Sequence, residues 1–308
     1  MWEVLAADVH SARISAVQTV IEDVDGVAYD LSIYNFPSTF HCTLEHLDAL
    51  FPTGGILAIR EPTFKSATQG DRPLVRVDSP TDITFVTPRS SLLNGVVWRA
   101  GDTVPRAPAM LATVDAWQQR GNAFFKTSQW FLAAFAYSYA LGLDPGALVV
   151  RLNRAEAYLR LGYFSGAQYD AQKVLSTRGI APSHVEKALF RLAKAQYGRR
   201  YYRDAARTFL RWKENNPGAA AADSWINKCR SRQHEGEKGQ YDWAGLYRAA
   251  RSQIRLDVAD FVGPIKVSSM AHRGGGRGVV TTRDVQVGEL LVSTHFSSML
   301  TRLNGYEV

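Results

Sequence analysis

The sequence contains almost no cysteine and no long hydrophobic run. Its two cysteines, Cys42 and Cys229, exclude a disulfide-stabilised scaffold and any zinc module that needs four cysteines. No apolar run approaches the roughly 18–20 residues that a membrane-spanning helix requires. The first ten residues, MWEVLAADVH, lack the basic and apolar regions of a secretory leader. We therefore expect an intracellular protein, cytoplasmic or nuclear, that does not associate with membranes.

The sequence also lacks a recognisable zinc-binding pattern. His41, Cys42 and His46 lie close together in the sequence, but their spacing matches no common zinc pattern and no second pair of ligands follows. We therefore assign them to ordinary surface or core positions and predict no metal site.

Charge is present but unevenly distributed. Hydrophobic residues make up 46% and charged residues 21% of the sequence, as in a globular protein, and the net charge is +7. Residues 1–113 carry 8 Lys and Arg against 13 Asp and Glu, residues 114–232 carry 19 against 8, and residues 233–308 carry 9 against 8. The middle third, with a net charge of +11, should attract an acidic partner, either nucleic acid or an acidic peptide.

The first third of the sequence has the pattern of short β-strands. Segments rich in β-branched residues and bounded by Gly, Pro, Asp or Ser predict strands within residues 13–24, 27–34, 54–62, 74–77 and 82–86. The pair Asp25 and Gly26 predicts a hairpin turn, and residues 44–51 predict one or two helical turns. We expect a small, mostly antiparallel β-rich domain over residues 1–92. Residues 93–113, with two prolines and little periodicity, are predicted to be a linker.

The middle third contains three segments that align with one another. They begin near residues 114, 148 and 186, so that the spacing is 34 and then 38 residues. Small residues recur at the eighth and twentieth positions of each segment: Gly121 and Ala133, Ala155 and Ala167, Ala193 and Ala205. Small residues let two antiparallel helices approach closely, and the large residues around them fill the remaining space. Such hairpins bury their apolar faces by stacking on their neighbours.

This pattern resembles the tetratricopeptide repeat (TPR) family. The resemblance implies an all-α superhelix of three repeats over residues 114–232, the last part of which, after Pro217, is an amphipathic capping helix. Residues 233–262 are predicted to be a helical connector, with a helix from about Trp243 to Arg255. Together with the β-rich first third, this predicts an α+β fold.

The first helix of each TPR repeat lines the concave surface, and its exposed stripe here contains Gln118, Asn122, Asn153, Lys187 and Arg191. The stripe resembles the dicarboxylate clamp of chaperone-binding TPR proteins, except that Gln118 replaces a lysine. The resemblance implies that the other four residues bind a peptide with an acidic C-terminus, such as a chaperone tail, and that the missing lysine weakens binding. A generic basic groove for acidic proteins remains the alternative. Nucleic acid is not favoured, because no groove-reading helix or RNA-binding motif is present.

The last third contains a glycine-rich segment at residues 272–293, HRGGGRGVVTTRDVQVGELLVS. It is neither a P-loop nor a dinucleotide-binding motif, and a plain β-hairpin is the simplest interpretation. Within it, residues 279–282 predict one strand and residues 290–292 a second. The segment also resembles the opening of the SET domain of protein lysine methyltransferases. The corresponding residues are Gly276-Arg277-Gly278, Thr282-Arg283-Asp284-Val285 and Gly288-Glu289-Leu290-Leu291.

The resemblance implies that Gly275, Arg277 and Gly278 would contact S-adenosylmethionine, mainly through the backbone. The order of β-rich region, TPR array and SET start resembles fungal TPR–SET proteins. The later Asn-His-Ser/Cys motif is missing, and Tyr306 lies in no context that matches the late SET tyrosine. We therefore expect residues 263–308 to be the N-terminal part of a truncated SET domain, with no catalytic residue and no cofactor bound by this chain.

The leading interpretation is a TPR module that binds acidic peptides or proteins in a basic concave groove and is itself inactive as an enzyme. Two alternatives remain open. The first is an S-adenosylmethionine-dependent protein lysine methyltransferase when full length, acting on a histone or another lysine substrate. The second is a co-chaperone-type adaptor that recognises acidic C-terminal peptides.

Overall fold

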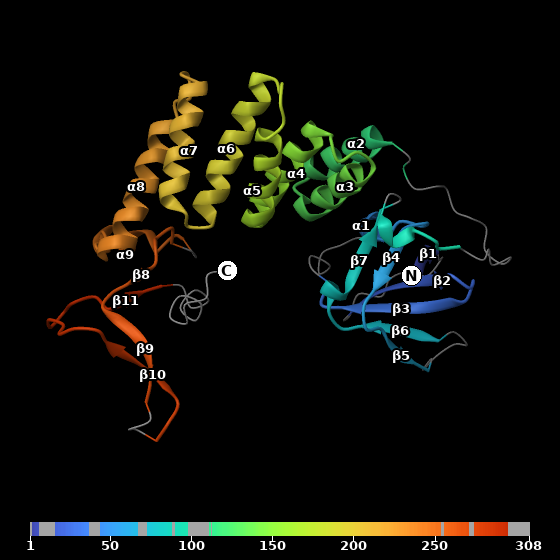
Figure 1. Ribbon diagram of the computed structural model, residues 1–308, viewed down its shortest axis with the longest axis horizontal. Coiled ribbons are helices and arrows are strands. Elements are labelled where there is room, and N and C mark those ends of the chain that lie inside the picture. Colours follow the sequence, from blue (N-terminus) through green and yellow to red (C-terminus); the bar gives the residue numbers. More distant parts are fainter. Residues whose placement is uncertain are drawn as a thin grey trace. The chain divides into compact units, whose positions relative to one another are not determined.

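The fold of the chain combines a β-sheet, a series of helix pairs and short two-stranded sheets (Figure 1). The computed structural model describes residues 2–5, 16–36, 44–66, 73–87, 90–97, 111, 113–253, 256–270 and 274–294. The chain forms two compact units, Met1–Val174 and Leu175–Val308. The predicted α+β class is confirmed, while the predicted domain bounds stay predictions. No helix among these residues is both long and apolar enough to cross a membrane.

The first unit begins with a seven-stranded sheet of order β5-β6-β3-β2-β1-β4-β7. Its strands are β1 (Trp2–Leu5), β2 (Ala16–Asp23), β3 (Ala28–Tyr34), β4 (Ile56–Ile59), β5 (Thr63–Lys65), β6 (Leu74–Val77) and β7 (Ile83–Val86). Neighbouring strands are antiparallel except β3 and β6, which confirms the mostly antiparallel prediction. The β2–β3 hairpin turns where Asp25 and Gly26 predict it, and Gly26 has a φ of 83°. Strands β1 and β5 were not predicted, because each is short and lacks a clear alternating pattern.

One face of the sheet shares its core with the first helical repeat. Leu31, Ile33 and Leu57 of the sheet are fully buried and belong to one cluster with Leu132 of helix α3 (Trp130–Leu143). The predicted short helix is present as α1 (Leu44–Leu50) and also contacts α3. Helix α3 is apolar on nearly every side because it packs against the sheet and against the neighbouring helices at once.

The helical region contains the three TPR-like pairs that the repeats predict, followed by a further helix. The remaining helices are α2 (Val114–Lys126), α4 (Leu148–Leu161), α5 (Phe164–Leu175), α6 (Pro182–Gly198), α7 (Tyr202–Asn215), α8 (Ala222–Lys238) and α9 (Trp243–Ala249). Local signals set their ends. The Thr113 hydroxyl accepts a hydrogen bond from the Ala116 amide at 3.2 Å and so caps α2, and Gly162 ends α4 with a left-handed φ of 76°.

The small repeat positions lie at the helix contacts, as expected. The alanines at the eighth and twentieth positions are fully buried: Ala133, Ala155, Ala167, Ala193 and Ala205. A Cβ atom on Gly121 would lie 2.5 Å from the ring of Tyr137, so only glycine allows α2 to approach α3 this closely. The repeat pattern is therefore a packing requirement of the helix pairs.

The second unit ends in two short two-stranded sheets. Strand β9 (Ile265–Ser269) pairs with β10 (Arg277–Thr281), and β8 (Phe261–Val262) pairs with β11 (Val292–Ser293). A C-terminal hairpin is present, but its arms are β9 and β10, so the predicted pairing of residues 279–282 with residues 290–292 is wrong. Of the strand predicted at residues 290–292, only Val292 lies in a strand, β11, and β11 pairs with β8. Strand β10 pairs instead with β9, which precedes it in the sequence.

Helix α9 is shorter than the predicted helix, which extended to Arg255. It begins at Trp243, where the Asp242 side chain accepts a hydrogen bond from the Gly245 amide at 2.9 Å. It ends at Ala249, whose carbonyl accepts a hydrogen bond from the Ser252 hydroxyl at 3.3 Å. The same carbonyl accepts a hydrogen bond from the Gln253 amide at 2.9 Å, so a turn follows Ala249 but the helix does not extend as far as predicted.

Candidate functional site

The two asparagines predicted to bind a peptide lie together in the first unit. The amide oxygen of Asn122 on α2 accepts hydrogen bonds from the Tyr137 hydroxyl at 2.8 Å and from the Asn153 amide of α4 at 3.2 Å. Both asparagines are half-buried. Gln118 lies one helical turn before Asn122 on the same face of α2. The structure therefore brings Asn122 and Asn153 into contact and fixes the orientation of the Asn122 amide.

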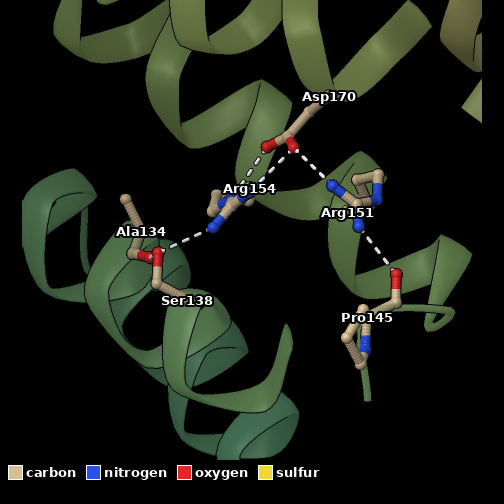
Figure 2. A network of polar contacts seen from close by, with 6 residues as sticks. All are labelled: Ala134, Ser138, Pro145, Arg151, Arg154 and Asp170. Carbon is tan, nitrogen blue, oxygen red and sulfur yellow. Dashed lines mark hydrogen bonds and ion pairs between the residues drawn. The ribbon is translucent and has the colours of Figure 1, made fainter. Parts of the chain in front are cut away.

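A buried ion-pair network connects α3, α4 and α5 in the same unit (Figure 2). The Asp170 carboxylate of α5 is fully buried and accepts hydrogen bonds from Arg154 at 2.7 and 2.8 Å and from Arg151 at 3.1 Å. Arg154 also donates to the Ser138 hydroxyl of α3 at 3.0 Å, and Arg151 donates to the Pro145 carbonyl at 2.6 Å. These two arginines therefore serve the internal structure of the array, although the charge count includes them in the basic middle third.

The sequence did contain a signal for this network. Asp170 lies three residues after the buried Ala167 and four before the buried Val174, so that it falls on the apolar face of α5. A carboxylate on such a face must be paired to be tolerated, and Arg151 and Arg154 are the basic residues of the preceding helix that reach it.

The predicted cations of the third repeat lie on α6 in the second unit. Lys187 is exposed, and Arg191, four residues later, is half-buried. The same face continues to Lys194 and borders on Tyr197, at spacings of three residues. Lys187 and Arg191 thus share one face of one helix. Convergence of these two residues with Asn122 and Asn153 across one groove stays a prediction.

Helix α8 adds residues to this surface that the sequence analysis missed. The ring of Trp225 on α8 lies 5.4 Å from the ammonium group of Lys194 and 5.1 Å from that of Lys228. The Tyr197 ring packs edge-on against Trp225, with centroids 5.5 Å apart. We call this surface the α6–α8 face; it comprises Lys187, Arg191, Lys194, Tyr197, Trp225 and Lys228. Its missed part could have been found from the spacing of Trp225 and Lys228, which lie three residues apart on α8.

An acidic side chain of the chain itself is bound at one end of the α6–α8 face. Asp257, in the segment after α9, accepts a hydrogen bond from the Tyr197 hydroxyl, 3.0 Å from each carboxylate oxygen. The Lys228 ammonium lies 2.5 Å from the same carboxylate. Burial and the negative charge of Asp257 raise the pKa of Tyr197, so its hydroxyl stays protonated and continues to donate. This end of the face therefore accepts a carboxylate.

The residues that follow Asp257 are held by buried polar contacts. The backbone amide of Ala259 donates to the Glu235 carboxylate of α8 at 3.0 Å, and its carbonyl accepts from the Tyr241 hydroxyl at 2.8 Å. Asp260, which is 2% exposed, forms an ion pair with Arg200. We call these contacts the connector clasp, because they hold residues 259–260 against α8 and the end of α6.

The glycine loop at residues 274–276 has a structural explanation. Gly275 has a φ of 97°, a conformation that glycine adopts without strain, and among the residues that the structure describes no atom lies within 4 Å of the position of a Cβ there. A Cβ on Gly278 would lie 2.8 Å from the Met270 side chain across the hairpin. Arg277 is exposed at the start of β10. The closed β9–β10 turn thus accounts for these glycines, and the predicted contact of Gly275, Arg277 and Gly278 with a cofactor stays a prediction.

The described residues contain no group of three or more histidine, cysteine, aspartate or glutamate side chains that could hold a metal ion. His41 and Cys42 lie outside these residues, as does Tyr306, and the side chain of His46 is not described either.

Two curated proteins are similar in sequence, whereas no family model matches the chain. A protein named "Methyltransferase" from Gibberella zeae is 27% identical over 297 residues, which are 91% of this chain and 37% of that protein. Tetratricopeptide repeat protein 12 of Mus musculus is 30% identical over 103 residues, which are 33% of this chain and 14% of that protein. The chain thus spans well under half of either relative.

Solved structures of TPR domains match part of the chain. The Arabidopsis OM64 TPR domain is 26% identical with a TM-score of 0.35, over 38% of this chain and 93% of that one. The Sgt2 TPR domain from Aspergillus fumigatus is 25% identical with a TM-score of 0.37, over 47% of this chain and 99% of that one. The first TPR of Spaghetti (RPAP3) bound to the HSP90 peptide SRMEEVD is 24% identical with a TM-score of 0.35, over 38% and 90%.

Proposed function

We propose that the chain is a protein-interaction module whose helical repeats bind an acidic peptide on the α6–α8 face. The observation that carries the proposal is the cluster of cations on this face together with the bound carboxylate of Asp257. Lys187, Arg191 and Lys194 follow one another along one face of α6. Asp257 shows that the end of this face accepts an acidic side chain.

The chemistry of the proposed site differs between its two parts. Arg191 is half-buried and can donate a charge-assisted hydrogen bond to a carboxylate, and Lys187 adds a second positive charge one turn away. In the first unit the corresponding residues are the neutral amides Asn122 and Asn153, and two arginines of α4, Arg151 and Arg154, are bound to Asp170. We infer that α6 supplies most of the charge-assisted binding and that the asparagines add hydrogen bonds to the peptide backbone or its terminal carboxylate.

A fluorescence anisotropy titration tests this proposal. The probe is SRMEEVD, the peptide that the Spaghetti (RPAP3) domain binds, labelled at its N-terminus. Arg191→Ala should weaken binding about 10-fold or more, since a charged hydrogen bond contributes about 1.5–3 kcal/mol. Amidating the peptide's C-terminus should weaken it similarly.

The matched control is Arg211→Ala, which removes the same charge from an exposed position on α7. It should change the affinity less than about twofold, because an exposed charge away from the site acts only through screened long-range attraction. Binding that is indifferent both to Arg191→Ala and to amidation would contradict the proposal.

A second function, methyl transfer by the longer protein, is favoured by the similarity to the Gibberella zeae protein along 91% of this chain. In this proposal the β9–β10 hairpin is the opening of a SET domain, and Gly275, Arg277 and Gly278 form one side of a site for S-adenosylmethionine. The exposed backbone of Gly274, Gly275 and Gly276 fits such a contact, since no atom of the described residues lies within 4 Å of their Cβ positions. Because the loop is open, it can contact a ligand from one side only.

Isothermal titration of this 308-residue chain with S-adenosylmethionine should therefore show a dissociation constant weaker than about 1 mM. A loop that contacts a ligand on one side cannot bury most of its surface, and burial is what provides affinity in small-molecule sites. Radiolabelled methyl transfer to protein substrates should be absent. A micromolar dissociation constant or measurable turnover would show that these residues form a complete site.

A further inference from the structure

The α6–α8 face already holds a carboxylate from its own chain. Asp257 bonds to Tyr197 at 3.0 Å and to Lys228 at 2.5 Å, at the end of the face beyond Lys194. The segment therefore occupies part of the surface on which an acidic partner would bind.

The contacts of Asp257 are more exposed than those of Ala259 and Asp260, which follow it in the sequence. Asp260 is almost fully buried, and the Ala259 amide is bonded to the buried Glu235, so these two positions are anchored. The side chains of Asp257 and Lys228 are 44% and 43% exposed. Exposed ion pairs contribute little to stability, because water competes for both charges. Asp257 can therefore leave its position while the connector clasp stays intact.

The spacing of residues along α6 indicates which peptide could replace Asp257. Arg191 and Tyr197 are six residues apart, which is about 9 Å along a helix. An extended peptide covers that distance in about three residues. A ligand with one carboxylate at Arg191 and an acidic side chain about three residues away fits both positions.

We propose that Tyr197 and Lys228 form a second carboxylate subsite on the α6–α8 face, which Asp257 occupies in the absence of a partner. A bound acidic peptide displaces Asp257 and places its own acidic side chain there. This inference rests on the proposed peptide-binding function and adds to it a competitor built into the chain.

The test compares the affinities of wild type and Asp257→Asn for SRMEEVD by fluorescence anisotropy. Removing the competing charge should tighten binding about two- to fivefold, in line with the small contribution of an exposed ion pair. Asp257 is exposed, so the variant should fold as the wild type does. The matched control is Asp284→Asn, which removes the same charge from an exposed position in the C-terminal part of the unit and should leave the affinity unchanged.

Two further titrations make the test specific. In a Lys228→Met background, Asp257→Asn should give no gain, because the subsite has lost its cation. With the peptide SRMQQVD, the gain should also disappear, because the peptide lacks the two glutamates, two and three residues before its C-terminal aspartate, that would be placed there. An unchanged or weaker affinity of Asp257→Asn, or an equal gain from Asp284→Asn, would overturn the inference.

The outcomes separate this inference from the function on which it rests. If wild-type binding depends on Arg191 and on the peptide's terminal carboxylate while Asp257→Asn gives no gain, only the second subsite is wrong. If binding is indifferent to Arg191→Ala and to amidation, the proposed function fails, and the inference fails with it.

Discussion

Replacing Asp170 with alanine should lower the free energy of unfolding by about 3–5 kcal/mol. The Asp170 carboxylate is fully buried and bonds to Arg151 and Arg154, whose side chains are only 13% and 16% exposed. Alanine would leave two largely buried guanidinium groups without their carboxylate, and the cost of desolvating them would no longer be offset. Urea denaturation followed by circular dichroism measures the loss as a lower unfolding midpoint.

The control for this experiment is a carboxylate on a different helix, α4. Glu156 pairs with Arg160 four residues later on the same helix, and the Arg160 side chain is 55% exposed. Glu156→Ala should cost only about 0.3–0.5 kcal/mol, as is usual for ion pairs four residues apart on one helix. If Asp170→Ala cost no more than Glu156→Ala, the network in Figure 2 would not stabilise the array.

The same network explains why the basic character of the middle third overstates its capacity to bind a partner. The sequence count treats every arginine as available for binding. In the structure, however, Arg151 and Arg154 of α4 are bound to Asp170 on α5, and Arg154 also to Ser138 on α3. Charge patterning reports how many cations a segment has. It does not report which of them are paired across helices, since pairing depends on residues brought together only by folding.

The repeats were predictable because their signal is local and periodic. Gly121 and the alanines at matching positions mark where two helices approach, and the structure buries all of them. The contact between Asn122 and Asn153 also follows from the repeat, because equivalent helices stack in register. In the same way, the turn residues Asp25 and Gly26 predict the β2–β3 hairpin from four neighbouring positions.

What could not be predicted depends on contacts between segments far apart in sequence. Asp257 lies 60 residues from Tyr197, and nothing in either neighbourhood indicates that they meet. Strand β11 pairs with β8, although its nearest predicted partner is β10. In each case the deciding interaction involves a single side chain or a strand of two residues.

The connector clasp is one of the contacts in the second unit that hold the C-terminal segment against the helices. Glu235 of α8 bonds to the Ala259 amide and pairs with Arg232 at 2.6 Å, so that both of its oxygens are used. A Cβ on Gly236 would lie 3.2 Å from the Asp260 carbonyl, which shows how closely the segment approaches α8. A two-stranded sheet such as β9–β10 is marginally stable alone, and the clasp is where the segment that leads into it is anchored.

Asp260→Ala should therefore release the C-terminal segment while leaving the helices of the second unit folded. Asp260 is nearly fully buried and Arg200 is 27% exposed, so breaking the pair should lower the opening free energy of residues 259–270 by about 3 kcal/mol, the lower end for buried pairs. Native-state hydrogen exchange measures this opening, because local unfolding exposes backbone amides of the segment before those of α6 to α8. Asp204→Ala, which breaks the exposed pair with Arg207, is the matched control and should leave the exchange of residues 259–270 unchanged. Faster exchange spread evenly over α6, α7 and α8 would mean instead that Asp260 stabilises the helical array as a whole, and unchanged exchange would mean that the clasp does not depend on this ion pair.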